Sequence, residues 1–280
     1  MAEGKTFAHK PKVPIVMSTP ETLEILFEDN HLIAVNKRSS DIVQGDITND
    51  RTLDNVIREY LRIKYEKPGE AWLGTIHRID RPVSGVILYA KTSKCLSRMM
   101  KAFKHREVAK TYWAVVKGTP PEEEGHVINW LKKNQERNKS YAHDRPGDGR
   151  KESELKYYLL GKGDHYNFLE VHPKTGRHHQ IRVTLSSLGC PIKGDIKYGA
   201  RRTNDNASIH LHARQIQFVH PTRREVVRIT APPPEDNLWD KMLELDEKVQ
   251  QSGSDLHSLI ENGLHVRACG IDGGGISCGS

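Results

Sequence analysis

The residues best suited to chemistry lie in the segment from His77 to Thr92, which reads HRIDRPVSGVILYAKT. Asp80 stands there between Arg78 and Arg81. A guanidinium within a few ångströms favours the ionised form of an aspartate, so we expect Asp80 to be a carboxylate at neutral pH, able to act as a nucleophile or a base. Charge spacing by itself more often marks an ion pair at a surface turn, and the residues alone leave both interpretations open.

A second cluster of reactive side chains lies between Lys174 and Ala200, in KTGRHHQIRVTLSSLGCPIKGDIKYGA. Arg177 and Arg182 bracket two histidines, His178 and His179. Neighbouring histidines on a helix point apart, and no cluster of matching carboxylates follows, so this pair does not predict a metal site.

Hydrophobic periodicity predicts the elements that position these residues. Alternation predicts a hairpin over 23–35, with a turn at Asp29, and helical spacing predicts helices capped by Thr52 and by Ser93. Pro82, Ser84 and Gly85 favour a tight turn before a buried strand over 86–90. Further strands are expected over 110–116, 167–172, 209–218 with a bulge near Arg214, and 226–229, and further helices over 180–188 and 238–249.

The segment Glu122 to Gly149 is polar and rich in turn formers, and its basic residues are interleaved with Trp130 and Tyr141. This pattern is typical of a hairpin in which aromatic rings stack on RNA bases and lysines meet phosphates. It is equally typical of a mobile, solvated loop. Both interpretations stay open.

Three motifs together resemble the RluA family of RNA pseudouridine synthases. HRIDRPVSGVILYAKT resembles that family's catalytic pattern HRLDRxTSGLLLxAK, REVAKTYWAVVKG resembles RxVxKxYxAxVxG, and the block from Lys174 to Ala200 resembles TGRTHQIRxHLxxxGxPIxGDxxYG. The resemblance covers roughly Leu23 to Pro234. Ile79 and Val83 replace a leucine and a threonine of the family pattern, and neither changes the charge at the site.

Other departures from the family fall beside the motifs. Lys37 is followed by Arg38, Ser39 and Ser40 in place of Pro-Ser-Gly. His178 stands for a threonine and Thr184 for a histidine, both next to the HQIR core.

The resemblance implies the roles of three residues in catalysis. Asp80 would be the nucleophile, Tyr112 would face the target base, and Arg182 would pair with the carboxylate of Asp80. We expect this ion pair in preference to one with the neighbours in sequence, because a partner across the cleft also orients the carboxylate.

Five further residues are expected to bind substrate. Arg78 would fill the space left by a base turned out of its stack, and Ile181 would line the pocket. The remaining candidates for contact with phosphate or with the pocket are Arg81, Lys110 and Arg177.

The family also implies an α/β (α+β) pseudouridine synthase fold, a long mixed and mainly antiparallel sheet with flanking helices and loops around a central cleft. We expect residues 1–20 to form an N-terminal extension, 21–250 the catalytic domain, and 251–280 a Gly/Ser-rich tail. No internal repeat and no second domain is indicated.

Composition limits the other possibilities. The chain has 280 residues and a net charge of +7, which is compatible with a polyanionic partner such as RNA. No window approaches the length of a membrane span and the first twenty residues lack an apolar core, so we expect a cytoplasmic protein without a signal peptide. We also expect a monomer. The four cysteines have no CxxC spacing, and no cofactor or metal is expected.

The sequence therefore predicts an isomerase that converts a specific uridine of ribosomal or transfer RNA to pseudouridine. Two other classes of protein are compatible with a basic chain that suits an RNA partner: a non-catalytic RNA-binding or RNA-folding protein, and a hydrolase of nucleic acid. The presence of Asp80, Tyr112 and Arg182 together disfavours the first, and the lack of paired acidic metal ligands disfavours a metal-dependent nuclease.

Overall fold

The computed structural model describes residues 13–14, 16–43 and 51–251, so most of the predicted N-terminal extension and all of the predicted tail except Gln251 lie outside the described residues. The strands are β1 (Ile25–Glu28), β2 (Leu32–Lys37), β3 (Gly74–Thr75), β4 (Ser84–Ala90), β5 (Ala109–Val116), β6 (Glu124–Asn134), β7 (Lys139–His143), β8 (Lys151–Lys162), β9 (Asn167–Pro173), β10 (Leu211–Val219) and β11 (Val226–Thr230). The helices are α1 (Leu53–Lys64), α2 (Ser93–Lys104), α3 (Gln180–Ser187), the short 3-10 helix η1 (Ile196–Tyr198) and α4 (Asn237–Gln251).

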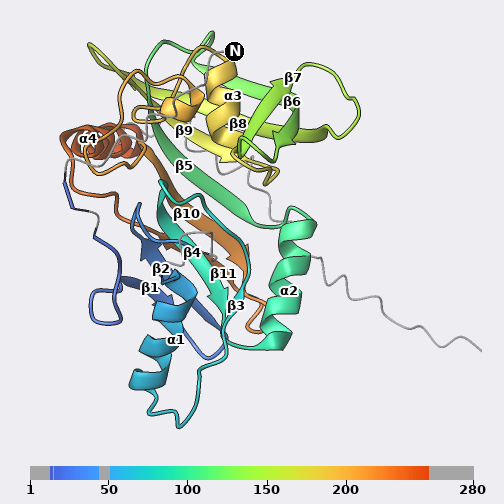
Figure 1. The fold of residues 1–280 in the computed structure, drawn as a ribbon, viewed down its shortest axis with the longest axis vertical. Coiled ribbons are helices and arrows are strands. Elements are labelled where there is room, and N and C mark those ends of the chain that lie inside the picture. The colour runs from blue at the N-terminus through green and yellow to red at the C-terminus, as the bar shows by residue number, and fades with distance from the viewer. Residues whose placement is uncertain (1–12, 15, 44–50, 252–280) are drawn as a thin grey trace, which may run out of the picture.

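An 11-stranded sheet runs through the molecule in the order β1-β2-β4-β10-β5-β9-β8-β6-β7, with β11 paired to β10 and β3 to β4 (Figure 1). The central pair of β4 and β10 is parallel, with Ser84 opposite His212. The other strand pairs of the described chain are antiparallel. This arrangement confirms the predicted mixed, mainly antiparallel sheet.

Successive side chains of the strands point to opposite faces of the sheet, and the buried apolar residues of the described chain form four clusters. On one face, α1 packs on Ile33 and Val35 of β2, and Trp239 and Met242 of α4 pack on Trp113 of β5. The apolar residues of α1 that recur at helical spacing are the ones that become buried, as the sequence predicts.

The opposite face carries the largest core and, with it, the candidate site. Met99 of α2 and Leu185 of α3 pack there against the strands, beside Leu88 and Leu211. In Figure 1, α1 and α2 lie in the lower half of the molecule, and α3 lies in the upper half beside β6 to β9. The helix that carries Arg182 and the loop that carries Asp80 are thus brought together from two halves of the sheet.

The start of α2 differs from the prediction. Thr92, and not Ser93, is the N-cap residue, because its extended backbone (φ −141°) lets its hydroxyl accept a hydrogen bond from the amide of Cys95 at 3.3 Å. Ser93 is the first helical residue. Thr52 does occupy the N-cap position of α1, although its side chain makes no capping hydrogen bond.

The turn after Asp80 is also shorter than predicted. The amide of Val83 donates to the carbonyl oxygen of Asp80 at 3.0 Å and closes the turn, and Ser84 and Gly85 are already the first residues of β4. Gly85 has a φ of +113°, and a Cβ atom there would lie 2.3 Å from the carbonyl oxygen of Ala213. The glycine is therefore required by the close approach of β10.

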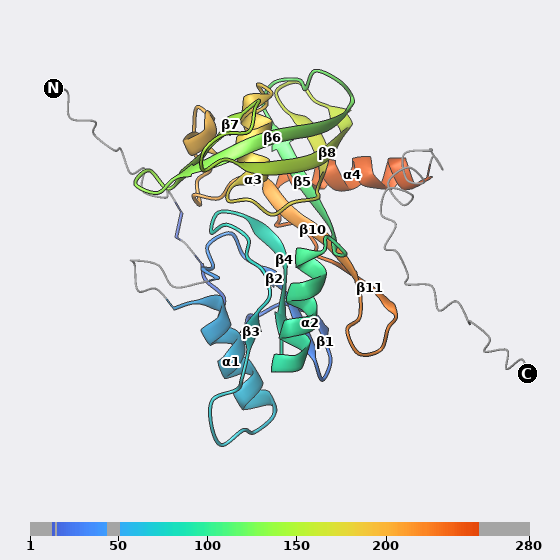
Figure 2. The same cartoon turned by 90° about the vertical axis from the view of Figure 1, so that its right-hand side faces the viewer.

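The polar segment 122–149 forms a hairpin and not an irregular loop, whereas the stacking of its aromatic rings on RNA stays a prediction. β6 and β7 pair in antiparallel register, with Asn134 opposite Lys139. Figure 2 shows this hairpin at the upper end of the molecule, away from α1. β8 was not predicted, because its buried Ser153, Leu155 and Tyr157 alternate with charged residues and give a weak hydrophobic pattern.

The predicted irregularity in β10 is confirmed. Its register against β5 shifts between Ala213 and Gln215. Arg214, at this bulge, places its guanidinium 4.1 Å from the centroid of the Trp113 ring and donates to the carbonyl oxygen of Ala231 at 2.8 Å. In the described part of the chain, no helix is both long enough and apolar enough to cross a membrane.

Candidate active site

Asp80 lies in a cleft of about 710 Å³ between the two halves of the sheet. A cleft of this size accommodates a nucleotide-sized ligand. It is lined by seven of the eight residues singled out from the sequence, namely Arg78, Asp80, Lys110, Tyr112, Arg177, Ile181 and Arg182. The eighth, Arg81, is not among the residues that line it.

The predicted contact between Arg182 and Asp80 is confirmed. Arg182 Nη1 donates to Asp80 Oδ2 at 2.9 Å, across 102 positions of sequence. The Arg182 side chain is only 6% exposed, whereas that of Asp80 is 29% exposed. The guanidinium is thus a buried support, and the carboxylate it holds is accessible to a ligand in the cleft.

A second carboxylate holds the other side of this guanidinium. Arg182 donates from Nε to Asp195 Oδ2 at 2.6 Å and from Nη2 to Asp195 Oδ1 at 2.9 Å. Burial acts to lower the pKa of Arg182, but the carboxylates of Asp195 and Asp80 outweigh it and raise the pKa above its ordinary value. The sequence analysis missed Asp195, although it is the acidic residue of the GDxxYG part of the third motif.

The turn before α3 directs a histidine at the same carboxylate. His179 adopts a left-handed conformation (φ 53°), which costs a non-glycine residue about 1–2 kcal/mol. Gln180 holds this turn, because its Oε1 accepts from Thr175 Oγ1 at 2.7 Å and from the amide of Arg177 at 2.9 Å. His179 Nε2 lies 3.6 Å from Asp80 Oδ2 as a result.

These neighbours determine the charge on Asp80. Burial acts to raise its pKa, but His179, which carries a charge only when it is protonated, and the guanidinium of Arg182 outweigh burial and hold the pKa of the carboxyl group below its ordinary value. Burial lowers the pKa of His179 to about 3, so its imidazole is neutral at neutral pH. The permanent positive charge beside Asp80 is therefore that of Arg182.

Tyr112 and Lys110 reach the cleft from β5. Burial raises the pKa of Tyr112, and the charge of Asp80 adds to the effect, so the phenol keeps its proton at neutral pH. Lys110 Nζ donates to the carbonyl oxygen of Thr175 at 3.3 Å, and burial lowers the pKa of Lys110 to about 8. Both side chains line the cleft together with Asp80.

Two residues that were not predicted, the partly buried His77 and the buried Lys37, anchor the catalytic segment. The amide of Leu88 donates to His77 Nε2 at 3.1 Å, and the His77 ring stacks on Phe103 with centroids 4.9 Å apart. Lys37 Nζ, on β2, donates to three carbonyl oxygens, including that of Arg81 at 3.0 Å. Arg81 thus takes part in the site through its backbone.

The rim of the cleft is positively charged. Arg78 and Arg177 are exposed, and Arg177 Nε donates to the carbonyl oxygen of Glu152 at 2.7 Å. Lys133, from the β6–β7 hairpin, also lines the cleft and was not singled out from the sequence. Such a rim favours the approach of a phosphate backbone.

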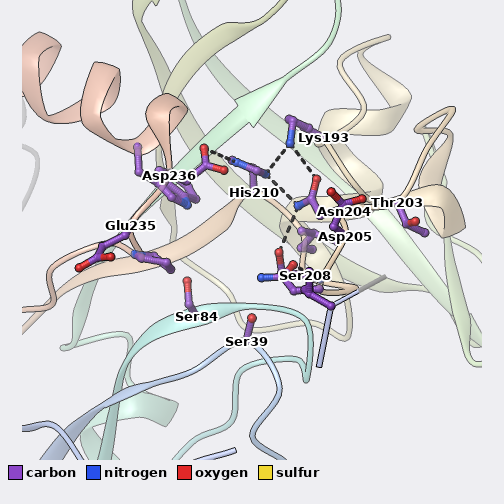
Figure 3. Close-up of a pocket in the computed structure, with 15 residues that line it drawn as sticks. Ser39, Ser84, Lys193, Thr203, Asn204, Asp205, Ser208, His210, Glu235 and Asp236 are labelled. Carbon is purple, nitrogen blue, oxygen red and sulfur yellow. Dashed lines mark hydrogen bonds and ion pairs between the residues drawn. The ribbon is translucent and has the colours of Figure 1, made fainter. Parts of the chain in front are cut away.

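A second cavity, of about 330 Å³, lies on the opposite face beside Trp239 and shares no lining residue with the first (Figure 3). Its polar groups bond one another: Lys193 Nζ donates to Asn204 Oδ1 at 2.8 Å, and His210 pairs with Asn204 at 2.9 Å and with Asp236 at 3.1 Å. These hydrogen bonds hold the loop that precedes β10, which contains Asn204 and His210, against Lys193 and Asp236. Among the described residues, no group of three or more His, Cys, Asp or Glu side chains is placed to hold a metal ion.

The fold is that of a pseudouridylate synthase domain. The human protein RNA Pseudouridylate Synthase Domain Containing 1 superposes with a TM-score of 0.64 at 25% identity, over 81% of this chain and 90% of that one. Human RNA Pseudouridylate Synthase Domain Containing 4 superposes with a TM-score of 0.65 at 23% identity, over 79% and 92% of the two chains.

Sequence comparison then gives the family. The family model described as RNA pseudouridylate synthase matches residues 31–187. A Bacillus subtilis protein named as an uncharacterized RNA pseudouridine synthase, YlyB, is 30% identical over 87% of this chain and 78% of its own length. The Vibrio cholerae ribosomal large subunit pseudouridine synthase C is 35% identical over 74% of this chain and 65% of its own length. The chain belongs to the RNA pseudouridylate synthase family, as the motifs predict, and is an isomerase of that family.

Proposed function

We propose that this protein converts a uridine within structured ribosomal or transfer RNA to pseudouridine, with Asp80 as the nucleophile. The reaction breaks the bond between N1 of uracil and C1′ of the ribose and forms a bond between C5 and the same C1′. The C5 proton is removed and N1 takes up a proton, so the composition of the RNA does not change. No oxidation and no transfer to a second molecule is required.

The observation that carries this proposal is the accessible, ionised carboxylate of Asp80 on a buried guanidinium. Arg182 and His179 both meet the Oδ2 atom of Asp80, which leaves Oδ1 as the oxygen that we assign to nucleophilic attack. Because Asp195 holds Arg182 from the other side, the guanidinium does not have to reorient when the carboxylate reacts.

The other residues of the cleft suit the handling of a uracil base. We assign to Tyr112 the stacking surface for the ring, and to Ile181, 7% exposed, an apolar wall of the pocket. The protonated phenol of Tyr112 can also donate a hydrogen bond during proton transfer. Lys110 completes this side of the pocket.

A uridine must leave its stack to reach Asp80, at a cost of a few kcal/mol. We assign to Arg78, exposed at the cleft, the role of filling the vacated space. Arg177 and Lys133 would bind the phosphates on either side. Relatives support both RNA classes: one is the ribosomal enzyme of Vibrio cholerae, and another, 31% identical over 79% of this chain and 94% of its own length, is tRNA pseudouridine synthase C of Vibrio vulnificus.

The test is the release of tritium from RNA labelled at C5 of uridine. We expect release with the wild-type protein, none with Asp80→Asn, and unchanged release with Asp164→Asn, which alters an exposed carboxylate in the β8–β9 turn. Asp80→Asn should still bind RNA, since it leaves the basic rim intact. RNA binding by the wild-type protein without release would favour the alternative of a non-catalytic RNA-binding or RNA-folding protein.

A further inference from the structure

A chain of hydrogen bonds leads from the β6–β7 hairpin to His179, whose other ring nitrogen faces the catalytic aspartate. The amide of Ser140, on β7, donates to the hydroxyl oxygen of Tyr198 at 2.8 Å. The same hydroxyl lies 2.8 Å from His179 Nδ1, and His179 Nε2 faces Asp80 Oδ2 at 3.6 Å. Ser140 and Tyr198 lie outside the lining of the cleft, and they are 1% and 3% exposed.

The donors and acceptors of this chain favour one direction. A backbone amide only donates, so the Tyr198 oxygen accepts from Ser140, and His179 Nδ1, at 2.8 Å, is the acceptor that we assign to the proton of Tyr198. A neutral imidazole with an accepting Nδ1 carries its hydrogen on Nε2. That hydrogen points to the carboxylate of Asp80.

The surroundings of the Tyr198 ring hold the hydroxyl in place. Tyr198 packs with Leu131, Val183 and Ala142, which come from β6, α3 and β7. Its ring also lies 5.1 Å from the Arg182 guanidinium carbon. Tyr198 therefore touches both the hairpin and the helix that carries Arg182, and its hydroxyl has two defined partners.

The side chain of Ser140 makes a separate contact with the same turn. Its hydroxyl lies 2.9 Å from His178 Nδ1 and 2.8 Å from the His178 carbonyl oxygen. His178 stacks on His179, with ring centroids 3.7 Å apart, so the two rings do not point apart as predicted, because both residues lie in the turn before α3 and not on the helix. The hairpin that supplies Lys133 to the cleft thus contacts the turn before α3 through the side chain of Ser140, and contacts Tyr198 through the backbone amide of the same residue.

We propose that Ser140 and Tyr198 are positioning residues of the isomerase, which hold His179 with its Nε2 hydrogen toward Asp80 and so couple the β6–β7 hairpin to the nucleophile. This inference rests on the proposed function. It goes beyond it in assigning a task to two residues that touch neither the substrate cleft nor Asp80.

The variant Tyr198→Phe tests the proposal, because it keeps the packed ring and removes the hydroxyl. We expect single-turnover isomerisation to slow by roughly 10- to 100-fold, the range that a small misplacement of a reacting group produces, while the Kd for RNA stays unchanged. The control is Tyr60→Phe, which removes a hydroxyl bonded to Glu28 and Lys64 on the opposite face, and which should isomerise at the wild-type rate. A wild-type rate for Tyr198→Phe, or weaker RNA binding with no loss of rate, would overturn the proposal.

Nitrogen-15 NMR of the His179 ring gives a readout that does not depend on activity. In the wild-type protein we expect a protonated Nε2 and an accepting Nδ1, and in Tyr198→Phe a displaced Nδ1 resonance. Ser140→Ala keeps the backbone donor to Tyr198 and removes only the contact with His178, so it should displace the Nδ1 resonance less than Tyr198→Phe does. A wild-type ring protonated on Nδ1 would refute the hydrogen-bond chain even if Tyr198→Phe failed to fold. Wild-type protein that shows the expected ring but releases no tritium would contradict the proposed function and leave the hydrogen-bond chain standing.

Discussion

At the scale of single residues, the site depends on one guanidinium shared between two carboxylates. Arg182 is buried, and Asp195 binds it in a bidentate fashion while Asp80 takes the remaining nitrogen. A bidentate partner fixes the plane of the guanidinium as well as its position. Asp195 therefore orients the group that orients the nucleophile.

Asp195→Asn should show this dependence in stability. The change keeps the shape of the side chain but removes a 1% exposed negative charge beside Arg182. Since breaking a buried ion pair costs about 3–5 kcal/mol, we expect the free energy of unfolding, measured with urea, to fall by about 3 kcal/mol. Glu123→Gln, which breaks the exposed pair with Lys162, should have little effect. Equal effects of the two changes would contradict the structural role of Asp195.

At the scale of elements, the close approach of β10 to β4 determines where β4 begins, and so positions the loop that carries Asp80 directly before it. Gly85 lies opposite Ala213 in this short parallel pair and has a left-handed backbone. Gly85→Ala should lower the free energy of unfolding by about 2–4 kcal/mol, because it adds backbone strain and a steric clash. Gly69→Ala, where a Cβ atom meets nothing within 4 Å, is the matched control for thermal unfolding. If both variants unfold at the same temperature, the close approach of the strands is not essential.

Local pattern was sufficient to predict most elements but not their ends. The apolar spacing of α1 and the alternation in β10 predict those elements because one face of each is buried. The N-cap of α2 was misplaced because Thr92 and Ser93 are both good caps, and only backbone geometry decides between them. β8 was missed because charged residues fill its less buried positions.

The candidate site was predictable only where a motif carries it. The pairing of Arg182 with Asp80 joins residues 102 positions apart, and the family resemblance alone indicated it. The parts played by Asp195 and Tyr198 follow from how the 3-10 helix η1 packs beside α3, which no local pattern predicts. Lys133 lines the cleft because the β6–β7 hairpin, which carries it, lies beside the cleft in the folded protein.

At the scale of the whole molecule, neutral histidines that are buried or partly buried couple folding to pH. Burial lowers the pKa of His77 and His179 to about 3 and that of His212 to about 4, from an ordinary value of 6.5. Below pH 6.5 the unfolded chain therefore binds protons that the native protein does not bind. The free energy of unfolding should fall as the pH is lowered from about 7 to 4. The carboxyl of Asp80 acts in the same direction at lower pH, because its contribution to stability is lost as the pH falls through its lowered native pKa.

The variant His77→Gln removes the contribution of one of these histidines to the pH dependence of stability. The glutamine amide oxygen can accept the hydrogen bond that the amide of Leu88 gives to His77 Nε2, but the side chain cannot be protonated. A plot of unfolding free energy against pH between 6 and 4 should therefore be less steep by about 1.4 kcal/mol per pH unit, the value for one proton. His165→Gln, at an exposed position in the β8–β9 turn, should keep the wild-type slope. If all three proteins give the same slope, His77 is protonated in the native state, and the neutral ring that anchors the catalytic segment to β4 is ruled out.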